Sequence, residues 1–443
     1  MQDFHLKLEK SLEMQRRAKK IIPGMSQLLS KRPDRFSFGI WPGYFKKAKG
    51  VKVWDLDGNE YIDMSIGGIG ANVLGYADPD VDQAVMETIK AGTSSSLNCP
   101  EEIELAELLC NLHPWAEMVR FARTGGEAMT IAVRIARAYT GRDIVAFCGY
   151  HGWHDWYLAA NIGANEALSG HLQAGLDPIG IPDALVGTAL PFKYNDLGAL
   201  EKIVYTHKND LAAIIMEPVR SQLPQSNFLV GAKALAKECG SVFIFDEISA
   251  GFRMNTGGAH LLYNVIPDIA VFSKALGNGY PVAAIIGIGK VMQAAQKTFI
   301  SSTNWTERVG PTAALATLTK HSKHKVGDHL ITIGELVQKG WKEMAQKHGL
   351  NLDVTGIPPL SHFSFKFEND LAGRAFFVQL MLEQGILAAN SFYSMYVHNT
   401  GHVKAYLKAV DRAFAEISHA LSNKDLEKRL IGRPAVAGFK RLA

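Results

Sequence analysis

A lysine follows one of the most apolar runs of the chain. Residues 269–273 read IAVFS, and Lys274 comes directly after them, ahead of the glycine-rich segment ALGNGYP. An amine held against an apolar wall has a lowered pKa and becomes a nucleophile toward carbonyl groups. The structural alternative is a lysine whose stem is buried and whose amine reaches solvent.

Two acidic residues, Asp246 and Glu247, end the run SVFIFDE at 241–247. A carboxylate at the end of a buried strand is costly unless a cation or a hydrogen-bond donor stabilises it. Asp246 therefore requires a positive partner. That partner is either a protonated ligand nitrogen or a side chain such as Arg253.

Two further strand ends carry groups that suit a phosphorylated, ring-shaped ligand. Thr124, Gly125 and Gly126 follow the run MVRFA and open a helical pattern, where exposed N–H groups bind an anion. A tight turn is the alternative for the two glycines. Tyr150 and His151 follow the run DIVAFC, where a planar aromatic side chain could stack on a ring. Core packing accounts equally well for the neighbouring residues Trp153 and Trp156.

Taken together, these groups are more specific than any one of them. An anion cup, a flat aromatic side chain, a carboxylate for a protonated pyridine nitrogen and a nucleophilic lysine are the groups that pyridoxal 5'-phosphate requires. Ligands of open parallel sheets bind at the carboxyl ends of the strands. The four segments are therefore expected to meet at one edge of a sheet.

The elements that must position these residues are readable from the apolar pattern. Several candidate strands are apolar throughout, which is typical of a mainly parallel sheet covered by helices on both faces. These strands are 118–122, 143–148, 211–218, 241–247, 269–273 and 282–289. A hairpin is expected over 45–63, with its turn at Asp57-Gly58-Asn59. A long helical stretch is expected beyond Pro311, and a functional loop or lid over 158–190.

The expected domains are an N-terminal helix and hairpin (1–70), a large cofactor domain (71–310) and a smaller α+β domain (311–443). The 443 residues are 47% hydrophobic and 20% charged, which excludes a disordered or fibrous chain. A net charge of +4 excludes the charge pattern of a nucleic-acid binder. No metal site is expected, because the four cysteines show no paired spacing. We expect a cytoplasmic protein without a membrane segment.

The chain resembles the class III aminotransferases of fold type I, and among them most closely the glutamate-1-semialdehyde 2,1-aminomutases. The resemblance implies a large domain with a mainly parallel seven-stranded sheet flanked by helices, and a smaller α+β domain. The segments that carry the resemblance are WDLDGNEYIDM (54–64), MVRFARTGGEA (118–128), AYTGRDIVAF (138–147), YHG (150–152), MEP (216–218), FDEISAGFR (245–253), PDIAVFSKALGNGYPVAA (267–284) and MLEQGI (381–386).

The resemblance assigns roles to individual residues. It implies that Lys274 forms the internal aldimine with pyridoxal 5'-phosphate, that Asp246 keeps the ring nitrogen protonated and that Tyr150 stacks on the ring. The remaining implied cofactor contacts are Thr124, Gly125 and Gly126 at the phosphate, and His151, Glu217 and Ile248.

The resemblance also implies a homodimer with shared active sites. A threonine of the neighbouring subunit completes the phosphate site in the family, and counting back from Pro311 places it at Thr306. Thr303 is the competing candidate, because the family's Thr-x-x-x-Asn-Pro reads Thr-Glu-Arg-Val-Gly-Pro here.

The expected function is amino transfer from an amino-acid donor to an aldehyde or ketone. The alternative within the same chemistry is the intramolecular aminomutase, which gives 5-aminolevulinate. The chain departs from the aminomutases where they bind substrate: it has Lys31 in the segment after Pro23-Gly24, and Tyr393 in place of an acid. Arg220 could bind a substrate carboxylate instead, so the candidate substrate contacts are Arg220, Lys31 and Tyr393.

Two alternatives come from other functional classes. A non-catalytic binding protein of the same fold is disfavoured, because both Lys274 and Asp246 are retained. A nicotinamide-dependent enzyme is disfavoured because the chain lacks a complete G-x-G-x-x-G with an acidic residue downstream.

Overall fold

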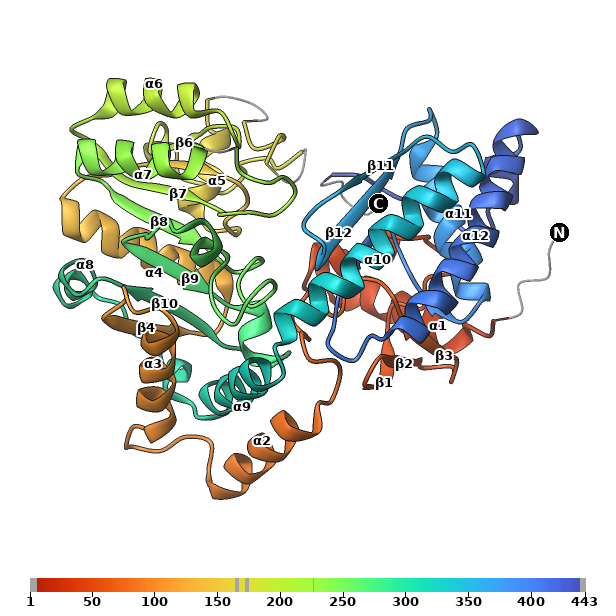
Figure 1. Ribbon diagram of the computed structural model, residues 1–443, viewed down its shortest axis with the longest axis horizontal. Helices are drawn as coiled ribbons and strands as arrows, with labels where there is room; N and C mark the ends of the chain where they lie inside the picture. The colour runs from red at the N-terminus through yellow and green to blue at the C-terminus, as the bar shows by residue number, and fades with distance from the viewer. Residues whose placement is uncertain (1–5, 164–166, 172–174, 226, 439–443) are drawn as a thin grey trace. The chain divides into compact units, whose positions relative to one another are not determined.

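The computed structural model describes residues 6–163, 167–171, 175–225 and 227–438. The chain forms two compact units. Unit 1 consists of Met1–Asp78 with Asp328–Ala443, and unit 2 of Pro79–Gly327. Each unit is described by itself (Figure 1).

Unit 2 is built on a seven-stranded sheet in the order β4-β10-β9-β8-β7-β5-β6. β10 is antiparallel to both β4 and β9, and the other neighbours are parallel, so the expected mainly parallel α/β fold is confirmed. All six expected strands are present, and the short β6 is additional. The strands are β4 (Met118–Ala122), β5 (Ile144–Cys148), β6 (Ala189–Pro191), β7 (Leu211–Met216), β8 (Val242–Asp246), β9 (Ile269–Phe272) and β10 (Ala283–Gly287).

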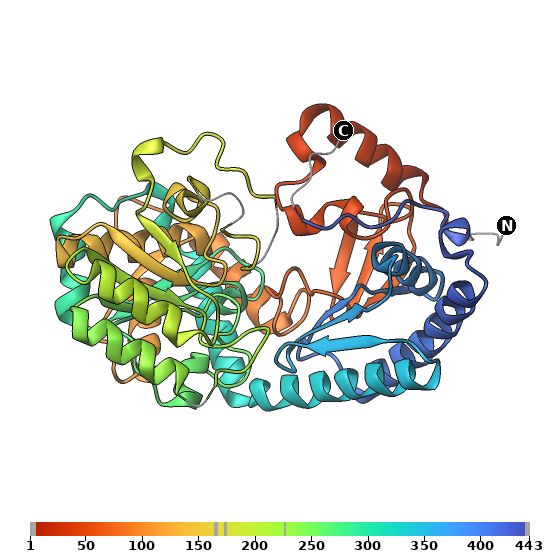
Figure 2. The same ribbon diagram turned by 90° about the horizontal axis from the view of Figure 1, so that it is seen from above.

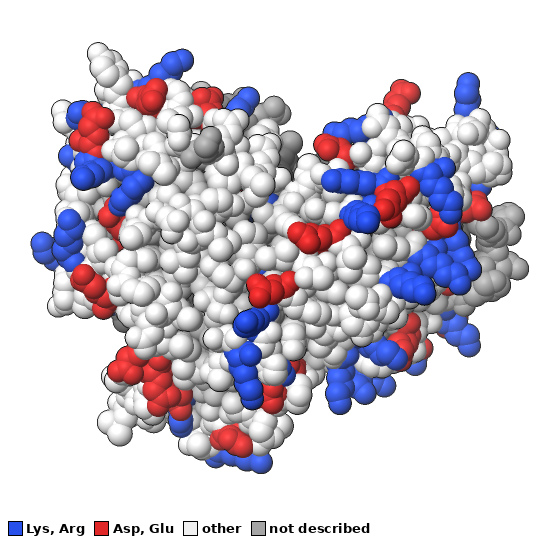
Figure 3. All heavy atoms as spheres, in the orientation of Figure 1, with Lys and Arg blue, Asp and Glu red and all other residues white. Residues whose placement is uncertain are grey.

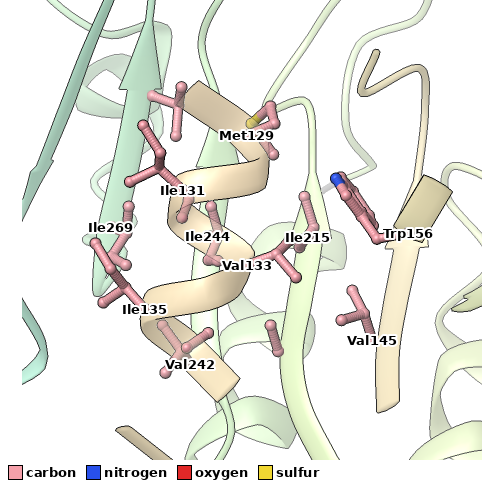
Figure 4. Packing of buried hydrophobic residues seen from close by; sticks show 14 of the residues in the cluster. Met129, Ile131, Val133, Ile135, Val145, Trp156, Ile215, Val242, Ile244 and Ile269 are labelled. Carbon is pink, nitrogen blue, oxygen red and sulfur yellow. The ribbon is translucent and has the colours of Figure 1, made fainter. Parts of the chain in front are cut away.

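Helices cover both faces of this sheet, because alternate strand residues point to opposite sides. On one face α4 (Gly125–Thr140) packs through Met129 and Val133, and Ile244 of β8 faces it (Figure 4). On the other face Phe243 and Phe245 of β8 pack in the cluster that includes α6 (Leu197–His207) and α7 (Phe228–Cys239). The strands that carry the candidate site are therefore buried on both sides.

The remaining helices of unit 2 set its boundary. α9 (Val309–Lys323) packs against α2 (Pro79–Ala91), α3 (Pro100–Leu112) and the short helix η7 (Lys274–Gly277). Unit 2 therefore ends at Gly327, rather than after residue 310 as the sequence indicated. The short helices α5 (Asp155–Leu158) and α8 (Gly289–Met292) complete the unit.

The other boundary also differs from the expected one. Gly50 and Tyr76 exchange backbone hydrogen bonds of 2.7 and 2.9 Å, which keep the segment after residue 70 in unit 1. The long helical stretch expected beyond Pro311 is divided into α9 and α10 (Val326–Lys347). Lys325, between them, has a φ of 48°, which a continuing helix does not allow.

Unit 1 contains two sheets, ordered β1-β2-β3-β13 and β11-β12-β14. α10 runs alongside β11 and β12 (Figure 2), where Trp341 packs on Phe363 in the main core of the unit. The expected hairpin turn is present, with Gly58 at a φ of 94° between β2 and β3. The elements are α1 (Glu9–Ile21), β1 (Phe45–Lys49), β2 (Lys52–Asp55), β3 (Glu60–Asp63), β11 (Leu352–Thr355), β12 (Leu360–Phe365), α11 (Asp370–Glu383), β13 (Ile386–Leu387), β14 (Ser391–Tyr393) and α12 (Thr400–Ser422).

The surface carries charged side chains of both signs, as expected from the nearly equal numbers of basic and acidic residues. Acidic and basic side chains are interspersed on the face drawn in Figure 3. No helix among the described residues is long and apolar enough to span a membrane. Between α5 and β6 the described residues contain only two single-turn helices, at Ala159–Asn161 and Asp183–Leu185.

Candidate active site

The candidate residues of unit 2 follow strands that run in the same direction. β4 is parallel in direction to β5, β7, β8 and β9, because β10 reverses the chain between β9 and β4. The carboxyl ends of these five strands therefore lie along one edge of the sheet. This edge carries Thr124–Gly126, Tyr150 and His151, Glu217 and Arg220, Asp246–Ile248, and Lys274.

Lys274 lies two residues beyond the end of β9, in a strained backbone conformation with a φ of 41°. Its Nζ donates a hydrogen bond of 2.7 Å to Oγ of Ser249. Burial, the larger cause, and the nearby charge of Arg220 together lower the pKa of Lys274 to about 8. A fraction of this amine is therefore neutral near physiological pH, as a nucleophile or a general base must be.

Asp246, the last residue of β8, is 2% exposed and pairs with a histidine. Its Oδ2 lies 2.8 Å from Nδ1 of His151, whose Nε2 lies 3.1 Å from the carbonyl oxygen of Cys148. Both ring nitrogens of His151 thus face oxygen atoms, one of the Asp246 carboxyl group and one of the backbone. Oδ1 of Asp246 accepts from the N–H of Ile248 at 2.9 Å. The Asp246 carboxyl group is thus held in place by a ring nitrogen at one oxygen and a backbone N–H at the other.

The start of α4 forms the candidate anion cup. Thr124 is the N-cap: its hydroxyl accepts from the N–H of Glu127, whose carboxylate accepts from the N–H of Thr124. The N–H groups of the first helical residues, Gly125 and Gly126, have no acceptor inside the helix. A Cβ at Gly125 would lie 2.8 Å from Cδ1 of Ile248. A glycine here lets α4 approach the turn after Asp246 closely.

Glu217 and Arg220 form an ion pair after β7. Nη1 of Arg220 lies 3.1 and 3.4 Å from the two carboxylate oxygens of Glu217. Both side chains line a cavity of about 300 Å³. A substrate carboxylate that binds Arg220 would therefore meet a guanidinium that already has a partner.

The aromatic residues after β5 separate into two groups. Tyr150 is partly buried and packs edge-to-face on Tyr157, with ring centroids 5.8 Å apart. Trp156 is 5% exposed and belongs to the core, whereas Trp153 is 69% exposed. Core packing thus explains Trp156 and does not explain Trp153.

The remaining candidates lie elsewhere. Thr306 is exposed, and its hydroxyl donates to the carbonyl oxygen of Thr303 at 3.1 Å. Arg123, which precedes Thr124, holds the same loop through the carbonyl oxygens of Trp305 and Glu307, each at 2.9 Å.

Two substrate candidates belong to unit 1. Lys31 is exposed at the end of a single helical turn. The hydroxyl of Tyr393, in β14, lies 3.5 Å from Nε2 of His362.

Ser249 is a residue of this site that the sequence did not single out. It lies three positions after Asp246. A polar side chain in an apolar segment beside the two acids could have marked it as a candidate. Its contact with Lys274 joins two segments that are 25 residues apart in the sequence, so it cannot be read from either segment alone.

Comparison with known proteins gives consistent matches over nearly the whole chain. A family model described as aminotransferase class-III matches residues 41–420. A 3-aminobutyryl-CoA aminotransferase from Cloacimonas acidaminovorans is 33% identical over 431 residues, covering 94% of this chain and 99% of the relative. A glutamate-1-semialdehyde 2,1-aminomutase from Desulforamulus reducens is 34% identical over 432 residues, covering 92% and 98%. Among solved structures, the internal aldimine form of Sphingopyxis sp. MTA144 FumI protein has a TM-score of 0.85 and 25% identity, covering 96% and 99%.

Proposed function

Because the chain belongs to the class III aminotransferases, a pyridoxal-phosphate-dependent family, we propose that it moves an amino group from an amino-acid donor to an aldehyde or ketone through Lys274. The observation that carries this proposal is the amine of Lys274, whose pKa is lowered to about 8 at the strand edge that also holds Asp246.

The residues present fit pyridoxal phosphate. Asp246 would hold the protonated ring nitrogen, because its contacts with His151 and with the N–H of Ile248 keep its carboxyl group oriented. The first N–H groups of α4 would bind the phosphate, with Ile248 packed against Gly125. Tyr150 would cover the ring face. When bound, the cofactor supplies a conjugated ring that accepts the electron pair of the broken carbon–hydrogen bond.

The chain's own part of the chemistry is proton movement. Nζ of Lys274, when neutral, would take the proton from the substrate carbon that bears the nitrogen and would pass it to the cofactor, because returning it to the same carbon would leave the substrate unchanged. The contact of Asp246 with His151, at 2.8 Å, keeps the carboxyl group oriented. Glu217 lies near enough to affect the pKa of Lys274, which it raises. The direction of amino transfer is then set by the substrates.

The test is cofactor attachment followed by a substrate screen. The purified protein should show a visible absorption band that borohydride removes, leaving the cofactor fixed on Lys274, and a Lys274→Ala variant should lack that band. A colourless protein without affinity for pyridoxal phosphate would contradict the proposal. The screen should then find an amino-acid donor that converts the bound cofactor to its amine form.

The aminomutase is the second candidate, because a relative at 34% identity carries that name. Conversion of glutamate-1-semialdehyde to 5-aminolevulinate without an added donor would favour it over the transaminase. The aminomutase and the transaminase would also differ in the residues that bind the substrate. We propose that Arg220 binds a substrate carboxylate, which would take the place of Glu217 in the ion pair, and that Lys31 and Tyr393 are further substrate contacts.

We also propose a homodimer in which Thr306 completes the phosphate site of the neighbouring subunit. Large apolar side chains at the surface of unit 2 support an interface: Leu97 is 82% exposed, and Phe299 is 83% exposed. Leu97 and Thr306 line the same cavity of about 260 Å³. An interface over Leu97 would therefore also cover the threonine.

A further inference from the structure

The amine of Lys274 contacts a hydroxyl group to which the family comparison gives no role. Nζ lies 2.7 Å from Oγ of Ser249, and Ser249 is 7% exposed. Among the described residues, Oγ of Ser249 is the one hydrogen-bond acceptor of the Lys274 ammonium group. A buried ammonium with one fixed partner depends strongly on that partner.

The turn that carries Ser249 is held from both sides. The carboxylate of Asp246 accepts from the N–H of Ile248, directly before Ser249, at 2.9 Å. Nε of Arg253, which is 1% exposed, donates to the carbonyl oxygen of Ser249 at 3.3 Å. The backbone of Ser249 is therefore fixed relative to Asp246.

The lysine is fixed independently. The hydroxyl of Ser273 donates to the carbonyl oxygen of Val282 at 3.1 Å, which ties the residue before Lys274 to the segment that leads into β10. Lys274 itself has the strained φ of 41°. The contact between Nζ and Oγ thus joins two segments whose backbones are held by other hydrogen bonds.

We propose that Ser249 is a positioning residue, which holds the ε-amine of Lys274 in both of its protonation states while that amine moves protons. The hydroxyl oxygen accepts from the ammonium, and the hydroxyl hydrogen donates to the lone pair of the neutral amine. Lys274 gains one proton from the substrate carbon and releases one proton at a different atom, so that it ends unchanged, and Ser249 neither gains nor loses one. The proposal rests on the proposed function, which assigns Lys274 this task.

The experiment begins with the protein freed of cofactor. Acetic anhydride labels only neutral amines, so the yield at Lys274 between pH 6 and pH 10, read by peptide mass spectrometry, reports the pKa of that amine. In Ser249→Ala the ammonium loses its acceptor, and the labelling midpoint should fall by about one pH unit. Ser249→Thr keeps a hydroxyl and should restore the wild-type midpoint. Ser273→Ala, which removes the neighbouring buried hydroxyl, should leave it in place.

The second readout uses the loaded enzyme and a donor deuterated at the reacting carbon. Ser249→Ala should lower kcat about tenfold, with KM changed less than about threefold and a larger isotope effect, because proton transfer has become slower. An unchanged labelling midpoint and isotope effect would overturn the proposal, and so would an equal shift in Ser273→Ala. Failure of the proposed function looks different: wild-type protein would then lack the borohydride-sensitive band, whatever the labelling midpoint.

Discussion

The two acids at the end of β8 each contact a histidine, and the two histidines differ in their second contact. Oε1 of Glu247 accepts from Nδ1 of His260 at 2.7 Å, while Nε2 of His260 accepts from the indole N–H of Trp115 at 3.0 Å. Because an indole can only donate, Nε2 of His260 is an acceptor. Asp246 instead contacts a histidine whose other ring nitrogen faces a backbone carbonyl oxygen. The adjacent acids are therefore suited to different tasks.

Asp246→Asn is the residue-level test of this difference. The amide carries no charge that would keep a ring nitrogen protonated, so kcat should fall at least about a hundredfold, measured with the best donor and acceptor of the screen. Glu247→Gln is the matched control, because its amide oxygen still accepts from His260. It should lower the thermal midpoint and keep kcat within about threefold. Equal losses in both variants would contradict a special role of Asp246.

Arg220 allows a test of the electrostatics at Lys274. The cation lowers the pKa of Lys274, so Arg220→Gln should raise this pKa above its value of about 8. Attachment of pyridoxal phosphate needs the neutral amine. The attachment rate of cofactor-free wild-type protein should therefore rise with pH through about 8, and the midpoint in Arg220→Gln should lie at higher pH. Stopped-flow absorbance measures both, and a midpoint that is unchanged or lower would refute the assignment.

At the scale of elements, the start of α4 depends on its contact with the turn after β8. In Gly125→Ala the new Cβ would press on Cδ1 of Ile248, 2.8 Å away, and would move the first N–H groups of α4. Affinity for pyridoxal phosphate should fall about tenfold, with little change in the thermal midpoint. Adding Ile248→Val removes that Cδ1 and should restore most of the affinity. Fluorescence titration measures both, and a double variant no better than the single one would exclude the steric explanation.

The strands were predictable from the sequence because buried parallel strands are apolar along their whole length, as in LAAIIM of β7. β6 was missed because only three residues, one of them a proline, form it. The division between α9 and α10 depends on the single residue Lys325. The boundary of unit 2 depends on the packing of α9 against α2, which no local pattern contains.

For the candidate site, the sequence identified the residues at the strand ends but not their partners. Strand ends identify Tyr150, Asp246 and Lys274 as candidates, because the direction of parallel strands brings those ends to one edge. The partners of these side chains are tertiary contacts. Neither the bond from Lys274 to Ser249 nor the ion pair that occupies Arg220 follows from the spacing of residues along the chain.

At the scale of the whole molecule, buried histidines should make the fold sensitive to acid. Burial lowers the pKa to about 4 for His113, His321 and His398, which are fully buried. Unfolding restores their ordinary pKa near 6.5. Between about pH 4 and pH 6.5 the unfolded chain therefore binds more protons than the folded chain. The stability from each neutral histidine is complete above pH 6.5 and is lost as the pH falls toward 4, by up to about 1.4 kcal/mol per pH unit.

His398→Asn tests one of these groups. Nδ1 of His398 accepts from the N–H of Met395 and Nε2 donates to the carbonyl oxygen of Asp63, so the variant should be less stable at pH 7.5. It should also lose less stability between pH 6.5 and 4.5 than the wild type, because one titrating group is gone. Thermal midpoints across this range measure both effects. A parallel decline in the two proteins would show that His398 takes up no proton on unfolding.

Whether Thr306 acts across a subunit interface can be tested by complementation. Two inactive subunits can restore one active site only when that site takes residues from both chains. Thr306→Ala should weaken binding of pyridoxal phosphate and not of unphosphorylated pyridoxal, whereas Thr303→Ala should weaken neither. In a mixed dimer of Lys274→Ala and Thr306→Ala subunits, one site would lack both groups and the other would combine an intact Lys274 with the partner's intact threonine. That dimer should regain about half of the wild-type activity, although each parent homodimer is impaired. Mixed dimers purified with two affinity tags and no more active than their parents would place Thr306 in its own subunit's site, or in no site.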